Sequence, residues 1–158
     1  MKKIVFSFLI IFATLLSTAC TKNATPTNFM ELKKNIKNEI EINTEKITSN
    51  VTFANYEIDG VIIQFILVRG TDGVVRIAFN TCQACNPSPT AYFIQKGEYL
   101  ECQNCKNKFH IDKIGIEKGG CNPAPVENKE IKGEKIVLDA KYVENFKEKF
   151  VNWKGQVK

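Results

Sequence analysis

The sequence predicts an α+β domain in which a β-rich antiparallel meander carries cysteine turns and is accompanied by a short N-terminal helix and a C-terminal helix. Runs of β-branched and aromatic residues alternate with Asp-Gly turns between residues 47 and 79, which is typical of hairpins. Cysteine pairs follow such runs, and apolar residues recur at helical spacing on both sides of this region. The 158 residues, of which 44% are hydrophobic, suffice for one domain with accessory segments.

Residues 1–19 resemble a signal peptide of the bacterial lipoprotein type. Two lysines precede an apolar run over residues 4–16, and this run of 13 residues is shorter than the roughly 20 that a spanning helix needs. Small residues then lead into Cys20, although Ser17 stands where such signals usually carry leucine. We expect lipidation of Cys20, which would anchor the chain to the membrane outside the cytoplasm. The alternative is ordinary secretory cleavage that leaves Cys20 as a free thiol.

Residues 20–46 are predicted to contain the lipid-anchored cysteine, a polar tether and a short helix. Asn28 and Glu31 have the spacing of a capping box. Apolar residues follow at helical spacing: Leu32, Ile36 and Ile40. This pattern predicts a helix over residues 29–38.

Residues 47–153 are predicted to form the functional domain. Its first part reads as three antiparallel strands joined by turns at residues 59–60 and 70–73. The third of these strands leads directly into Cys82, so the first cysteine pair is expected on a turn at a strand end. Such a turn holds a site rigidly.

The second half of this domain is predicted to contain a small hairpin over residues 91–101, with the second cysteine pair at its exit. A strand over residues 135–138 is followed by Asp139, which is a candidate N-cap for a helix over residues 140–152. The helix carries its large apolar residues on one face, which indicates packing against the core: Val143, Phe146 and Phe150.

The candidate site residues are five cysteines: Cys82, Cys85, Cys102, Cys105 and Cys121. The first four form two Cys-x-x-Cys pairs separated by 16 residues, which is the spacing of tetrahedral zinc and rubredoxin-like sites. Both thiolates of such a turn point at one ion while backbone N–H groups face the sulfurs. The pattern predicts a metal site without fixing the metal, because thiolates bind zinc, mononuclear iron and iron–sulfur clusters alike. The fifth cysteine, Cys121, would replace one of the four, ligate a second iron or act as a redox partner.

The cysteines also allow two other interpretations. A disulfide framework suits an oxidising compartment, but the doubled short spacing and the odd count of thiols beyond Cys20 argue against it. A thioredoxin-type motif expects a βαβ context, whereas Pro87 and Pro89 follow the first pair. The single histidine, His110, is interpreted as an exposed or partly packed side chain rather than a ligand.

Charge and motifs exclude several functional classes. The formal net charge is +5, and the acidic and basic residues are interspersed, so no nucleic-acid-binding stripe is present. Lys106 follows the second pair, which excludes a c-type haem motif there, and no hydrolase motif was found. The pattern favours a non-enzymatic metal-binding protein over an enzyme.

Several segments between residues 50 and 150 form a specific pattern: Val74 to Phe79 leading into Cys82-x-x-Cys85, Cys102-x-x-Cys105 with Phe109, Lys113-Ile114-Gly115, and Gly119-Gly120-Cys121-Asn122-Pro123-Ala124-Pro125. This pattern resembles that of the FtrD-like membrane iron–sulfur protein family, and the resemblance covers residues 50–150. It implies an extracytoplasmic or membrane-bound iron–sulfur protein that passes electrons during iron import. The implied partners are an iron permease and a periplasmic iron-binding protein.

All five cysteines from Cys82 to Cys121 match cysteines of that family. Two features depart from its pattern. Lys106 stands where glycine is expected after the second pair, and several membrane spans that many members carry before this domain are replaced by the lipoprotein-like signal. We therefore expect a lipid-anchored iron–sulfur protein that exchanges electrons with a separate membrane redox partner. A zinc-stabilised binding module and a thiol–disulfide oxidoreductase are the alternatives.

Overall fold

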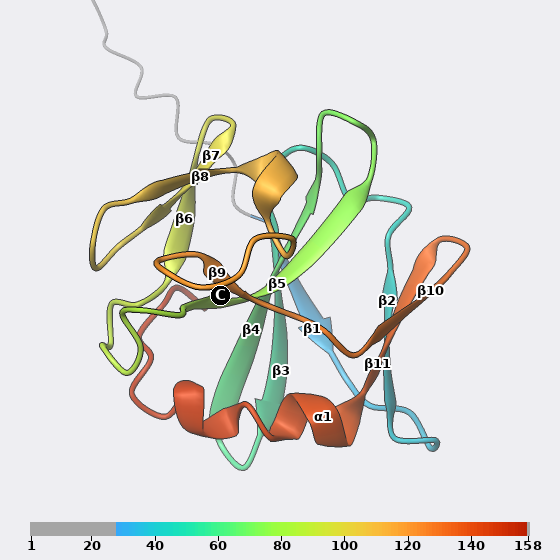
Figure 1. The fold of residues 1–158 in the computed structure, drawn as a ribbon. Helices are drawn as coiled ribbons and strands as arrows, with labels where there is room; N and C mark the ends of the chain where they lie inside the picture. Colours follow the sequence, from blue (N-terminus) through green and yellow to red (C-terminus); the bar gives the residue numbers. More distant parts are fainter. Residues whose placement is uncertain (1–27, 158) are drawn as a thin grey trace, which may run out of the picture.

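The computed structural model describes residues 28–157, which form three β-sheets with short helical turns (Figure 1). The main sheet has the strand order β1-β3-β4-β5-β9. All neighbours in it are antiparallel except β1 and β3, which are parallel. Its strands have these bounds: β1 Asn28–Leu32, β3 Thr52–Ile58, β4 Val61–Arg69, β5 Val75–Cys82 and β9 Pro123–Pro125. The meander β3-β4-β5 thus forms where the turn residues predict it.

Two three-stranded sheets flank the main sheet, with orders β6-β7-β8 and β10-β11-β2. The first contains β6 Phe93–Lys96, β7 Tyr99–Cys102 and β8 Lys108–His110. The second contains β10 Lys129–Lys132, β11 Lys135–Asp139 and β2 Glu39–Asn43. The helical turns are η1 Ile111–Lys113, α1 Ala140–Glu144 and η2 Lys147–Lys149.

The α+β class with two flanking helices is wrong, because the described chain is β-rich and its one α-helix is the short C-terminal α1. The segment predicted as a helix over residues 29–38 is strand β1 followed by a turn. Phe29 packs against Phe53 of β3, with ring centroids 5.9 Å apart, while Ile36 is fully exposed in the turn. Pairing with β3 therefore overrides the helical spacing of the apolar residues. The C-terminal helix begins after Asp139 as predicted but ends at Glu144, and η2 follows it.

The core consists of two hydrophobic clusters, which lie on the two faces of the main sheet. Alternate residues of β4 enter different clusters, so that Phe65 and Leu67 belong to the first and Ile66 to the second. This two-sided burial explains why β4 reads as a continuous apolar run. The first cluster lies against α1 and η2, where Phe146 stacks on Phe79 with centroids 4.1 Å apart. The second cluster contains Cys82 and Cys102, so the cysteine turns are built on a packed core.

A row of polar side chains, buried except for Glu31, crosses the main sheet. Asn55 donates to Glu31 (2.9 Å), Gln64 donates to Asn55 (2.8 Å), and Asn80 donates to Gln64 (2.7 Å). Asn80 also accepts a hydrogen bond from the backbone N–H of Phe93 (2.7 Å). These residues come from four adjacent strands and from β6, so the row ties the main sheet to the small sheet that carries the second cysteine pair. Buried amides need such partners because an unpaired polar group in the interior is destabilising.

We predict that Asn80→Leu lowers the free energy of unfolding by about 3 kcal/mol, because Gln64 and the Phe93 amide would both lose their partner. Denaturant unfolding measures the change. Asn128→Leu is the matched control, since Asn128 is exposed in a loop. Equal effects of the two substitutions would contradict the role assigned to the row.

Candidate metal centre

The two Cys-x-x-Cys segments form equivalent turns at the ends of strands. Cys82 ends β5, and its carbonyl accepts a hydrogen bond from the Asn86 amide (3.0 Å). Cys102 ends β7, and its carbonyl accepts one from the Lys106 amide (2.9 Å). Each turn thus follows a strand that is fixed by a sheet, as the sequence predicted.

Backbone amides point at the first sulfur of each turn. Burial raises the pKa of the Cys82 thiol well above its ordinary value, and hydrogen bonds from the amides of Cys85 and Ala84 oppose this rise. Burial likewise raises the pKa of Cys102 to about 11 against amide hydrogen bonds from Cys105 and Asn104. Amide donors stabilise a thiolate, and a cation at the site would favour deprotonation further. The turns are therefore prepared for thiolate ligands.

Cys121 reaches the same place on a loop between η1 and β9. The side chain of Gln83, inside the first cysteine turn, fastens this loop: its Oε1 accepts from the Gly119 amide (3.2 Å), and its Nε2 donates to the carbonyls of Asn122 (3.4 Å) and Pro123 (3.3 Å). Gly119 has φ +82°, a conformation that glycine adopts without strain. The Cys82 thiol donates to the carbonyl of Cys121 at 3.3 Å, which joins the loop to the first turn.

The two cysteine turns are also connected to each other through Asn104. Its Oδ1 accepts hydrogen bonds from the hydroxyls of Ser88 (2.8 Å) and Thr90 (2.9 Å), which lie just beyond the first turn. The C-terminal segment braces the same region, because Trp153 donates its Nε1–H to the carbonyl of Asn80 (2.8 Å). The first cysteine turn, the second cysteine turn and the Cys121 loop are thus held next to one another.

The sulfurs of four cysteines lie within 4.8 Å of one another: Cys82, Cys85, Cys105 and Cys121. The fifth, Cys102, lies beside this quartet, with its Sγ 4.0 Å from the Sγ of Cys85. All five are free thiols; Cys82 and Cys102 are buried and the others are partly exposed. The structure therefore brings together all five cysteines that the sequence singled out, although the quartet contains Cys121 in place of Cys102.

This donor set fits a thiophilic metal. A tetrahedral ion with metal–sulfur bonds of about 2.3 Å separates its sulfurs by about 3.8 Å, so the quartet needs only a small contraction. Thiolates are the ligands of iron–sulfur clusters as well as of zinc and copper(I). A bound cluster or ion would be held by the cysteines alone, since the described chain places no carboxylate or imidazole in the quartet.

Cys105 is the member of the quartet that comes from the second cysteine turn. Burial raises its pKa, but the Asn107 amide and the thiols of Cys102, Cys121 and Cys85 lower the pKa to about 7. The Cys105 thiol raises the pKa of Cys121. The side chain of Asn107, which hydrogen-bonds Cys121, opposes this rise. Sequence reasoning missed Gln83, Asn104 and Asn107, and their only signal was their position inside or next to the cysteine pairs.

His110 lies outside the thiol group, at the end of β8. Its Nδ1 accepts a hydrogen bond from the Asp112 amide (3.3 Å), and its ring meets Tyr99 edge-on at 5.3 Å. The imidazole is partly exposed, in agreement with its interpretation as an ordinary side chain. Cys20, the predicted lipidation site, lies outside the described residues.

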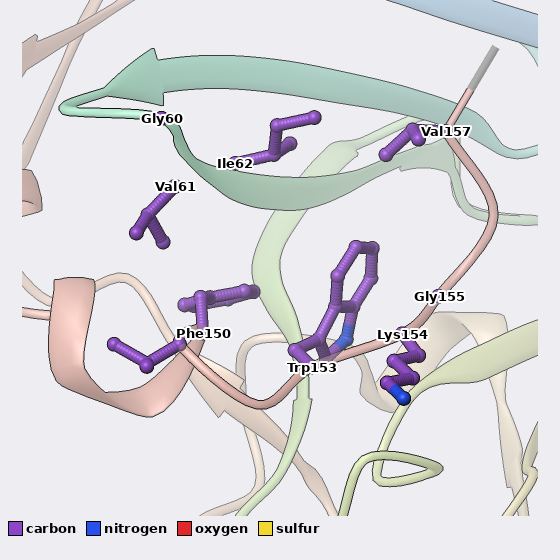
Figure 2. A pocket seen from close by; sticks show the side chains of 9 residues that line it. Gly60, Val61, Ile62, Phe150, Trp153, Lys154, Gly155 and Val157 are labelled. Atoms are coloured by element: carbon purple, nitrogen blue, oxygen red, sulfur yellow. The ribbon is translucent and has the colours of Figure 1, made fainter.

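Two pockets of the described chain lie near the first cysteine turn or the C-terminal segment. One of about 340 Å³ adjoins the first turn and is lined by Cys82, Gln83, Phe146 and Lys149, among others. Another, of about 350 Å³, lies between the start of β4 and the C-terminal segment. Figure 2 shows Trp153 projecting into the space below β4 in this second pocket. No thiol lines it, so it is separate from the metal centre.

Fold and site together define a β-rich domain that presents a cluster of thiols for a metal. Comparison with known families gives a more specific assignment. The family model described as membrane iron-sulfur containing protein FtrD-like matches residues 44–150, and the chain belongs to this family. The match confirms the resemblance found in the sequence, and it supports iron–sulfur or metal binding as the function. No curated protein matches the chain.

The family is described as a membrane family. Within residues 28–157, no helix has both the length and the apolar character that crossing a membrane requires.

Lys106 provides a test of the second turn. It has φ +63°, a left-handed conformation, which explains why glycine is expected at this position. We predict that Lys106→Gly keeps or raises the free energy of unfolding, whereas Lys106→Val lowers it by about 1–3 kcal/mol because a β-branched residue is strained there. Denaturant unfolding of the glycine and valine variants at Lys106 and at Lys108 measures which substitution each position tolerates better. Lys108, which lies in β8, is the control, and valine should be better tolerated than glycine there. The same ranking at both positions would contradict this explanation.

Proposed function

We propose that this protein is an extracytoplasmic, lipid-anchored iron–sulfur protein that transfers electrons during iron uptake. The observation that carries the proposal is the quartet of sulfurs within 4.8 Å, found in a chain whose family is described as membrane iron-sulfur containing. The electron partner would be a separate membrane protein, working with an iron permease and a periplasmic iron-binding protein. No catalysis is assigned to the protein itself.

An iron centre would supply one-electron exchange, and the chain would set its environment. The buried thiols Cys82 and Cys102 exclude water on the core side. Amide N–H groups of Ala84 and Asn104 donate to these sulfurs, and hydrogen bonds to ligand sulfurs are one of the means by which proteins adjust a reduction potential. The partly exposed Cys121 side would face an electron partner.

A zinc-stabilised module is the second candidate. The compactness of the quartet favours it, because the four sulfurs lie close enough together for a single tetrahedral ion. Such a protein would be colourless and would unfold when the metal is chelated.

We predict that the full chain, extracted from membranes without oxygen, contains iron and acid-labile sulfide in matching amounts. Iron and sulfide assays and the visible spectrum measure this. Cys105→Ser should lose most of both, because Cys105 belongs to the quartet, while His110→Ala should retain them. Zinc without sulfide would replace the iron proposal by the zinc module. A protein without metal but with a reactive thiol would indicate an oxidoreductase.

We predict that Cys20 carries the membrane anchor. Cells grown with labelled palmitate should incorporate the label into the wild-type protein and not into Cys20→Ser. Cys121→Ser is the matched control and should be labelled like the wild type. Label retained by Cys20→Ser, or absent from the wild type, would contradict lipid anchoring at this residue.

A further inference from the structure

The thiol group holds one cysteine more than a tetrahedral ion needs. The quartet is complete without Cys102, yet the Cys102 sulfur lies 4.0 Å from that of Cys85. Cys102 also lies in the same Cys-x-x-Cys turn as Cys105, which is a member of the quartet. Cys85 and Cys105 therefore belong to two overlapping sets, the quartet and a trio with Cys102.

Cys102 is more than a buried apolar residue. Its turn has the same backbone arrangement as the first cysteine turn, because the Lys106 amide donates to the carbonyl of Cys102 as the Asn86 amide donates to that of Cys82. Cys102 thus has the same local arrangement as Cys82, which is a member of the quartet.

Charge points to a second cation. One divalent ion leaves two of the quartet's four thiolate charges uncompensated, whereas two divalent ions on five thiolates leave one. Uncompensated charge in a partly buried site is strongly unfavourable.

We propose that the five cysteines form a centre for two thiophilic cations that share sulfurs. The quartet of Cys82, Cys85, Cys105 and Cys121 holds the first ion, and Cys102 holds the second together with Cys85 and Cys105. This inference rests on the metal-binding part of the proposed function but does not depend on the metal being iron.

The test uses the full chain in detergent, reduced, stripped of metal and titrated with cadmium in the absence of sulfide. Native mass spectrometry should show saturation at two cadmium ions per wild-type chain and at one per chain for Cys102→Ser. Cys102→Ala serves as a second variant, since Cys102 is fully buried and one substitution could disturb folding. Wild-type saturation at one ion, or two ions retained by folded Cys102 variants, would overturn the proposal.

Cadmium-113 NMR tests whether the two ions share sulfurs. The wild type should give two resonances with mutual scalar coupling, and Cys102→Ser should give one uncoupled resonance. His110→Ala is the control and should keep the coupled pair, because its imidazole lies outside the thiol group. Two uncoupled wild-type resonances, or loss of the second ion in His110→Ala, would place that ion elsewhere and refute the shared centre.

Failure of this inference is distinguishable from failure of the proposed function. Assays for iron and sulfide in the purified protein test the proposed function, and the cadmium experiments depend on neither iron nor sulfide. Two coupled cadmium ions in a protein purified with zinc would leave the two-ion centre standing and remove the iron role. One cadmium ion in a protein purified with iron and sulfide would refute the two-ion centre and leave the iron role in place.

Discussion

The row of hydrogen-bonded side chains from Glu31 to Asn80 constrains the sheet on which the cysteine turns are built. A slip of one residue between strands would turn these polar groups to the opposite face of the sheet and leave them unpaired. Asn80 lies two residues before Cys82 and also binds the backbone of Phe93 in β6. The row therefore fixes the position of the first cysteine turn and that of the sheet carrying the second. The geometry of the thiol group follows from both.

Local signals account for what the sequence predicted correctly. Strands β3, β4 and β5 are separated by tight turns that their residue types predict, and the spacing of each Cys-x-x-Cys pair predicts a turn as well. Strand β1 has no such signal. Its apolar residues, with Ile36 and Ile40 beyond them, match helical spacing by coincidence, and its conformation is decided by pairing with Phe53 and the rest of β3. Parallel pairing between segments separated by another strand leaves no local pattern.

The same distinction between local signals and contacts of distant segments holds at the group of five thiols. Spacing was enough to select five cysteines, but which sulfurs lie closest depends on contacts between distant segments. Cys121 enters the quartet because Gln83 holds its loop, and the second turn is positioned by the hydroxyls that bind Asn104. Neither contact can be read from spacing. The closeness of Cys102 to Cys85 likewise arises from two sheets meeting at one edge of a common core.

The distance along the chain between Cys82 and Cys121 has a consequence for protein lifetime. A metal bound to both would close a loop between residues 39 positions apart, as a covalent cross-link does. Loop-closure entropy for a cross-link of this length corresponds to about 4 kcal/mol, a large part of the stability of a small domain. The metal-free form would then unfold more often and be degraded sooner by proteases. Metal supply would thereby regulate the abundance of the protein without any change in its synthesis.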